Sequence, residues 1–275
     1  MSGELDHLID EWKAFVKNEN KNLIQKCLKI AQILEYPDLD ISSYSEKIND
    51  VGISLRNLIV KRRNPTYQIS ILDEYLFDKC GFHGEMEDYY NPKNNFLNHV
   101  IDNKSGIPIT LSIIYSEIAK FLDLEIKIVG FPSHVIVKFG DEMLLDPFHH
   151  GKLLSLDELQ EVLYNNYGDE FQLLPEYLNE IPTEMILVRM LRNLKNSYTE
   201  SYAYGMAIKC NKMILVIWPE SPEEIRDLGI IENKLKNYEK SIELLNHYLE
   251  LNPNAEDVDI ILELIKENRE KINYR

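Results

Sequence analysis

The sequence has few of the residues that mark several classes of protein. Cysteine occurs only three times in 275 residues, at Cys27, Cys80 and Cys210, with no CxxC pair. An odd number of widely spaced cysteines indicates neither a disulfide framework nor a thiolate zinc site, and it fits a reducing compartment. The longest apolar run covers residues 213–218, far short of the roughly 20 residues that span a membrane. The first residues are acidic and lack the pattern of a secretory signal, so we expect a cytoplasmic protein with no membrane partner.

Basic side chains are also scarce. The chain has 30 Lys and Arg against 46 Asp and Glu, a net charge of −16. Such a charge repels phosphate backbones, so we expect no nucleic-acid partner. We interpret the one basic cluster, Lys61-Arg62-Arg63, as the charged end of a helix. The hydrophobic content of 44%, with 11 Gly and 11 Pro, is typical of a globular chain.

Helical spacing of apolar residues dominates the first part of the chain. The pattern runs through residues 5–34 until Pro37, and continues through residues 44–60 and 67–77. Gly81 stands where a helix C-terminal cap is expected. The polar stretch that follows, EMEDYYNPKNN, is typical of a loop.

The period changes in the middle of the chain. Gly106-Ile107-Pro108 precedes a helix that we expect to be buried, because apolar side chains fill one of its faces. Residues 125–130 and 133–139 then alternate as strands do. A tight turn at Gly140-Asp141 would pair the second strand with residues 142–146 in a hairpin, with Phe139 opposite Glu142.

From about residue 175 the chain is helical again and carries a repeat signal. Pro219 and Pro253 are 34 residues apart, which is the tetratricopeptide period. Leu228-Gly229, Tyr238 and Ser241 fall near the positions where that repeat uses Leu-Gly, an aromatic and a small residue. One repeat cannot bury its own apolar face, so it must pack on the helices of residues 182–218 or on the central domain.

Three polar residues of the central region could carry chemistry: Thr110 at the start of the buried helix, His134 on a strand, and Asp146 at the end of the next strand. The hairpin register places His134 opposite Pro147, so His134 and Asp146 can meet. A carboxylate, a histidine and a nucleophile at a helix N-terminus form the arrangement of acyl-transfer sites. The alternative is a buried His–Asp pair that only stabilises the fold.

The central region also resembles the SirB1 family, whose members join a transglutaminase-like domain to tetratricopeptide repeats. The matching motifs are LF-x-x-x-GF-x-G, DYY-x-P-x-N, GIPITLS, FP-x-H and DPF-x-x-G, in family order within residues 75–155. The resemblance implies an α+β fold: N-terminal helices in residues 1–84, a transglutaminase-like (papain-like) core with a small antiparallel sheet in residues 85–165, and tetratricopeptide-like helices in residues 175–275. It also implies that His134 and Asp146 occupy the positions of the superfamily's catalytic His and Asp.

The position of the catalytic nucleophile differs from the one that this resemblance implies. The superfamily's cysteine stands at the start of the buried helix, and counting back from Asp123 reaches Pro108, with no cysteine between Cys80 and Cys210. Two functions stay open. One is a non-catalytic scaffold whose helical region binds a protein or peptide. The other is an amide hydrolase or acyl transferase with Thr110 or Ser112 as nucleophile, His134 as base and Asp146 as orienting group.

Other candidates carry less weight. His149-His150 could hold a metal together with His134 and Asp146, but adjacent histidines rarely point the same way, so we expect no metal and no cofactor. The tyrosines Tyr198, Tyr202 and Tyr204 could line a peptide groove in the helical region. We expect that groove to present an acidic surface to a basic or extended peptide. The sequence leaves the oligomeric state open.

Overall fold

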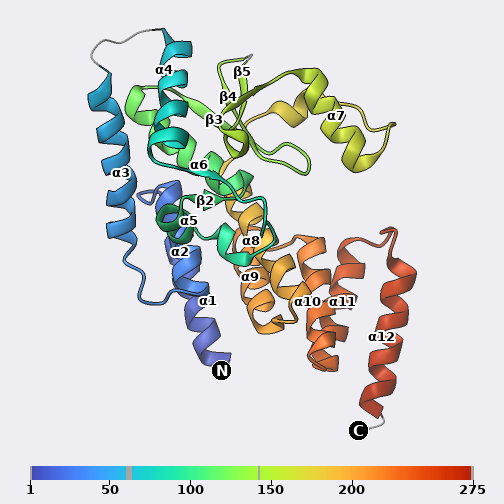
Figure 1. Cartoon of the computed structure of the whole chain (residues 1–275). Coiled ribbons are helices and arrows are strands. Elements are labelled where there is room, and N and C mark those ends of the chain that lie inside the picture. The colour runs from blue at the N-terminus through green and yellow to red at the C-terminus, as the bar shows by residue number, and fades with distance from the viewer. Residues whose placement is uncertain (1, 60–63, 142, 274–275) are drawn as a thin grey trace. The chain divides into compact units, whose positions relative to one another are not determined.

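A computed structural model describes residues 2–59, 64–141 and 143–273 (Figure 1). The chain divides into two compact units, one of residues Asn20–Leu187 and one that combines Met1–Glu19 with Val188–Arg275. None of the described helices is both long enough and apolar enough to cross a bilayer. The described chain as a whole confirms the α+β class, because helices dominate and the strands, all in the larger unit, form only small sheets.

Helices make up the first part of the larger unit. They are α2 (Leu23–Leu34), α3 (Ile41–Leu58), α4 (Pro65–Asp73), a π-helical turn (Glu74–Lys79) and α5 (Leu97–Asn103). A capping box between Asn22 and Gln25 starts α2, which is why the apolar pattern of residues 5–34 is split into two helices. The expected helix end at Val60 and the cluster Lys61-Arg62-Arg63 lie outside the described residues. The expected loop of residues 85–95 ends in a 3-10 turn, Pro92–Asn95, with Asn94 and Asn95 buried.

A four-stranded antiparallel sheet forms the centre of the larger unit. Its order is β3 (Ile126–Val129), β4 (Ile136–Phe139), β5 (Met143–Asp146) and β6 (Lys152–Leu154). A short parallel pair, β1 (His83–Gly84) with β2 (Ser105–Gly106), leads into helix α6 (Pro108–Ala119). The fourth strand, β6, was not among the strands that the alternation predicted, because its three residues are too short for a pattern.

Two helices enclose this sheet. Helix α7 (Leu156–Tyr167) buries Leu159 and Leu163 against Val129, Ile136 and Leu144. Helix α6 packs against β3 and β4, on the face to which the alternate strand residues point. As expected, α6 is buried, and nearly all of its residues have little exposed surface. The sheet and its two helices therefore form a layered core that fixes the ends of β4 and β5.

The hairpin of β4 and β5 differs from the predicted register by one residue. Phe139 pairs with Met143 instead of Glu142, so the connection is longer than the Gly140-Asp141 turn alone. Strand β4 also begins at Ile136, which leaves His134 in a bend before the strand and not on it. Ser133 takes a left-handed conformation, with φ of 60°, and this local turn ends the extended pattern that residues 133–139 predict.

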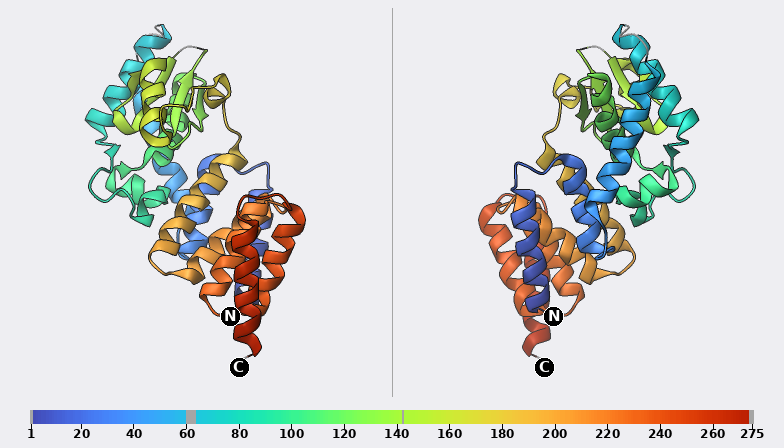
Figure 2. Two further views of the ribbon diagram at one scale, coloured as in Figure 1. Left: turned by 90° about the vertical axis from the view of Figure 1, so that its right-hand side faces the viewer. Right: turned by 90° about the vertical axis from the view of Figure 1, so that its left-hand side faces the viewer.

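The smaller unit consists of helices. They are α1 (Ser2–Val16), most of α8 (Thr183–Glu200), α9 (Tyr204–Ile217), α10 (Pro222–Lys234), α11 (Tyr238–Leu251) and α12 (Val258–Asn273). Helices α10, α11 and α12 pack side by side (Figure 2) around Ile225, Leu245 and Ile265. Helix α1 packs on α9, where the indole Nε1 of Trp12 donates to the carbonyl oxygen of Met213 at 3.0 Å.

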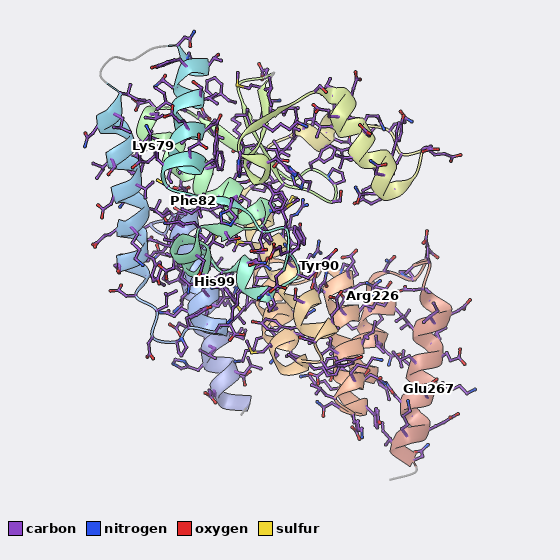
Figure 3. All side chains as sticks on the ribbon, in the orientation of Figure 1. Lys79, Phe82, Tyr90, His99, Arg226 and Glu267 are labelled. Atoms are coloured by element: carbon purple, nitrogen blue, oxygen red, sulfur yellow. The ribbon has the colours of Figure 1, made fainter. Side chains whose placement is uncertain are left out.

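The small residue of the predicted repeat lies in this helical packing. Ser241 is fully buried, and its hydroxyl donates to the carbonyl oxygen of Gly229 at 2.7 Å. The side-chain amide of Asn268, on α12, donates to the same hydroxyl at 3.0 Å. Ser241 thus links α10, α11 and α12. It can do so because a small side chain lets neighbouring helices approach closely. The residue next to Asn268 on α12, Glu267, points away from α11 (Figure 3).

Candidate functional site

His134 and Asp146 meet at one end of the central sheet. The Nε2 atom of His134 lies 2.9 Å from Oδ2 of Asp146. Asp146 is the last residue of β5, and His134 lies in the bend that precedes β4, so two neighbouring strands hold the pair. The prediction that these side chains come together is confirmed, although the register behind it was one residue off.

Asp146 has a second imidazole partner, His149, which the sequence did not predict. Its Nδ1 atom lies 2.7 Å from the same Oδ2 of Asp146, because the 3-10 turn Pro147–His149 folds the chain back over the end of β5. His150 points elsewhere, and its ring stacks on Phe77 with a centroid distance of 5.3 Å. The expectation that the adjacent histidines diverge therefore holds, but one of them joins His134 and Asp146. The Asp-Pro-Phe motif was the available signal, since Asp followed by Pro is typical of a turn.

The other oxygen of Asp146 is held by the backbone. Oδ1 accepts a hydrogen bond from the Phe148 N–H at 2.9 Å, which closes an Asx turn. Burial alone would raise the pKa of Asp146, but hydrogen bonds and charge from His134 and His149 outweigh it, so the pKa lies below its usual value. Asp146 is therefore ionised near neutral pH. Because an ionised carboxylate only accepts hydrogen bonds, both facing imidazole nitrogens must donate.

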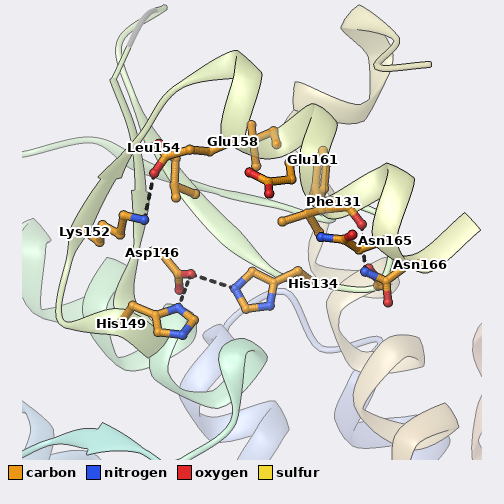
Figure 4. A pocket seen from close by; sticks show the side chains of 13 residues that line it. Phe131, His134, Asp146, His149, Lys152, Leu154, Glu158, Glu161, Asn165 and Asn166 are labelled. Atoms are coloured by element: carbon orange, nitrogen blue, oxygen red, sulfur yellow. Dashed lines mark hydrogen bonds and ion pairs between the residues drawn. The ribbon is translucent and has the colours of Figure 1, made fainter. Parts of the chain in front are cut away.

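The three side chains line a pocket of about 400 Å³ (Figure 4). Helix α7 forms the opposite wall and contributes Glu158, Glu161 and two asparagines, Asn165 and Asn166. Lys152 reaches Glu158 at 2.7 Å. This contact and the capping bonds from Ser155 lower the pKa of Glu158 to about 2. The wall was not predicted, although the capping pair Ser155 and Glu158 could have indicated the start of α7.

The candidate nucleophiles lie deeper in α6. Pro108 is the first residue of that helix and is buried. The Thr110 hydroxyl donates to the carbonyl oxygens of Ile107 and Asn94, at 3.0 and 3.2 Å. The Ser112 hydroxyl faces the carbonyl oxygen of Val135 at 3.4 Å. Both side chains have no exposed surface. The fold thus directs the two hydroxyls toward backbone carbonyl groups.

The three tyrosines of the expected peptide groove separate in the structure. Tyr198 is 5% exposed and belongs to the core of the helical unit. Tyr202 is 78% exposed, and its ring meets that of Tyr204 edge to face, with a centroid distance of 6.1 Å. As a groove residue, Tyr198 was the wrong choice, because helical spacing alone does not tell a core face from a surface face.

Comparison with known proteins agrees with this architecture. The fold defines a transglutaminase-like core followed by tetratricopeptide helices: the family described as "Transglutaminase-like superfamily" matches residues 42–192, and "Tetratricopeptide repeat" matches residues 194–266. The chain belongs to the transglutaminase-like superfamily and, within it, to the UPF0162 family that includes SirB1. The resemblance to SirB1 proteins is therefore confirmed.

Three relatives show the extent of the similarity. A UPF0162 protein of Xylella fastidiosa (strain Temecula1) is 33% identical over 254 residues, which cover 90% of each chain. The UPF0162 protein YchA of Escherichia coli (strain K12) is 27% identical, over 82% of this chain and 86% of that one. Protein SirB1 of Salmonella typhimurium (strain LT2) is 28% identical, over 72% and 74%. The similarity thus extends over both the core and the repeat region.

Proposed function

We propose that this protein is a non-catalytic binding protein, in which the transglutaminase-like core serves as a scaffold and the helical repeat region binds an extended segment of a partner protein. The observation that carries the proposal is the start of α6. Pro108, which has no nucleophilic atom, occupies the first position of the helix, and the nearest hydroxyls, of Thr110 and Ser112, are fully buried and face backbone carbonyl oxygens.

The rival function needs a hydroxyl that can reach a substrate. A general base activates a nucleophile only within hydrogen-bond distance, and the pair must face an open cleft. The cleft beside His134 is lined by residues of α7 and by Phe131, Ser133, His134, Asp146, His149, Lys152 and Leu154. Although Ser133 lies there, neither of the candidate nucleophiles, Thr110 and Ser112, is among the lining residues. This placement supports the scaffold over the hydrolase or acyl transferase.

The repeat region offers a place for an apolar side chain of a partner. Residues Ile217–Ser221, between α9 and α10, line a hollow of about 620 Å³. Trp218 is half-buried there, and the guanidinium group of Arg192 lies 5.3 Å from its ring centroid. Aromatic and arginine side chains are the residues that most often dominate the binding energy of protein interfaces. We therefore place the centre of recognition at Trp218.

The net charge of the helical repeat region does not favour a basic peptide as its partner. Residues 188–275 contain 13 basic and 15 acidic side chains, so the excess negative charge of the protein lies in the preceding residues. A nearly balanced surface does not attract basic segments at long range. The charge count therefore does not support an acidic groove for a basic peptide. The partner that we propose is an extended segment that binds through an apolar side chain.

One experiment tests the scaffold. The full chain and the variants Ser112→Ala, Thr110→Val and His134→Ala are incubated with a fluorophosphonate probe and with ester and peptide-amide substrates. We expect no covalent labelling, and the same background hydrolysis in all four proteins. Labelling that is lost in Ser112→Ala or Thr110→Val would overturn the scaffold and establish the hydrolase.

A second experiment tests the binding region. Peptides that bind the full chain are selected from a random displayed library, and their affinities are measured for the wild type and for Trp218→Ala. Tyr90→Ala, which removes an exposed aromatic side chain of the larger unit, outside the hollow, is the matched control. We expect at least about 30-fold weaker binding for Trp218→Ala, because truncation of a hot-spot residue costs about 2 kcal/mol or more, and no change for the control. Equal affinities in all three proteins would contradict recognition at Trp218.

A further inference from the structure

Three metal-ligating atoms converge at the mouth of the core pocket. His134, Asp146 and His149 each offer one ligand atom, and these atoms lie within 4.8 Å of one another. The three residues come from the bend before β4, the end of β5 and the turn after it. We infer that this cluster binds one divalent transition-metal ion of the Zn²⁺ class.

The separations of the ligand atoms suit such an ion. Zinc lies about 2.0–2.1 Å from histidine nitrogens and carboxylate oxygens, in tetrahedral geometry, so its ligand atoms are about 3.3 Å apart. The two nitrogens lie 2.9 and 2.7 Å from Oδ2 of Asp146. Outward movements of a few tenths of an ångström therefore bring each nitrogen to that separation from Oδ2. Each imidazole then binds the metal through the nitrogen that now donates to Asp146, and its proton moves to the other ring nitrogen or to solvent.

The surroundings hold the three ligands in this orientation. The Phe148 N–H fixes the second carboxylate oxygen of Asp146 at 2.9 Å. The Phe148 ring packs edge to face against both imidazoles, with centroid distances of 6.1 Å to His134 and 5.0 Å to His149. Such outer partners orient ligands and raise metal affinity, because the ligands lose little freedom on binding.

The pocket supplies negative charge and an open coordination position. Its lining includes the carboxylates of Asp146, Glu158 and Glu161 and a single lysine, Lys152, whose charge is paired with Glu158 at 2.7 Å. Asp146 is almost fully buried, whereas about half of the His149 side chain is exposed. The ion is therefore reached from the pocket, and a water molecule or an anionic group of a ligand can take the fourth position.

The donor set also selects the class of metal. Two imidazole nitrogens and one carboxylate suit Zn²⁺, Ni²⁺, Co²⁺ or Cu²⁺, whereas Mg²⁺ and Ca²⁺ take oxygen ligands. The site shares His134 and Asp146 with the rival enzyme but includes neither Thr110 nor Ser112. Its test measures metal binding and not hydrolysis, so its failure and the failure of the proposed function can be told apart.

The test measures Zn²⁺ binding to the full chain by calorimetry with a competing chelator. We expect one ion per chain. His149→Ala should weaken binding by at least the roughly 10–100-fold that loss of an outer partner costs a metal site, and so should His134→Ala. His150→Ala is the matched control, because this neighbouring imidazole stacks on Phe77, and it should bind as the wild type does.

A second measurement covers the case in which His134→Ala fails to fold. His149 is half exposed, so His149→Ala should unfold at the wild-type temperature, which a thermal melt without metal checks. Added Co²⁺ should give the intense visible absorption of a tetrahedral ion in the wild type and in His150→Ala, but not in His149→Ala. Absence of Zn²⁺ binding to the wild type, or equal binding to wild type and His149→Ala, would overturn the inference.

Discussion

The carboxyl group of Asp73 occupies the space in which a side chain at Gly151 would lie. A Cβ atom added to Gly151 would come within 2.3 Å of Oδ1 of Asp73, and Gly151 has a φ of +73°. The Gly151 N–H also donates to the carbonyl oxygen of Asp146 at 2.9 Å. Residue 151 therefore closes the turn that carries His149, and Asp73 at the end of α4 packs directly against that turn.

This contact predicts different effects of alanine at two glycines with similar backbone angles. Gly140 has a φ of +61° and open space around its Cβ position, so Gly140→Ala should cost about 1 kcal/mol of unfolding free energy, from backbone strain alone. Gly151→Ala adds a clash, and should cost about 3 kcal/mol. Urea denaturation of the two variants measures the difference. Equal losses would show that Asp73 moves aside without cost.

Asp73 also predicts a pH dependence of stability. Burial raises its pKa from 3.8 to about 6, although a hydrogen bond from the Tyr115 hydroxyl, at 2.7 Å, opposes the shift. The folded state thus binds a proton that the unfolded state releases near pH 4. The stability from that proton is complete below about pH 4 and is lost as the pH rises through 6.

The variant Asp73→Asn isolates this contribution. It cannot ionise, so its stability relative to the wild type should increase between pH 4 and pH 7, by on the order of 2 kcal/mol. Denaturation curves at several pH values measure the change, with Asp141→Asn, an exposed residue of the hairpin turn, as the control. A constant difference between Asp73→Asn and the wild type across this range would contradict the raised pKa.

The helical unit contains a buried ion cluster whose loss should be costly. The Nζ atom of Lys195 lies 2.6 Å from Oε2 of Glu224 and 2.6 Å from Oδ2 of Asp227, and Lys195 is only 4% exposed. Lys195→Ala leaves the buried Glu224 carboxylate with less compensation, and should cost about 3 kcal/mol. Lys271→Ala breaks the exposed pair with Glu267 and should cost less than about 1 kcal/mol. Thermal and urea unfolding distinguish the two, and similar small losses would contradict the role of Lys195.

The local pattern of the chain was enough for much of the fold. Apolar spacing predicted the buried helix α6, because apolar side chains that fill one face of a helix must pack against the rest of the protein. Alternation predicted strands β3 and β4, and the 34-residue spacing with Ser241 predicted the repeat helices. These features depend on neighbours in sequence, so sequence displays them. The meeting of His134 and Asp146 was also within reach, since both flank one hairpin.

Only the tertiary structure decided which side chains complete the site. A left-handed residue, Ser133, moved His134 off its strand, and one extra residue in the connection changed the hairpin register. The turn after Asp146 brought His149 into the cluster and left His150 outside, and α7 closed the pocket with Glu158. Each outcome depends on backbone angles at single residues or on packing between distant segments. The sequence by itself determined the buried helix, the hairpin, the repeat helices and the family, whereas the fold determined the three-ligand cluster.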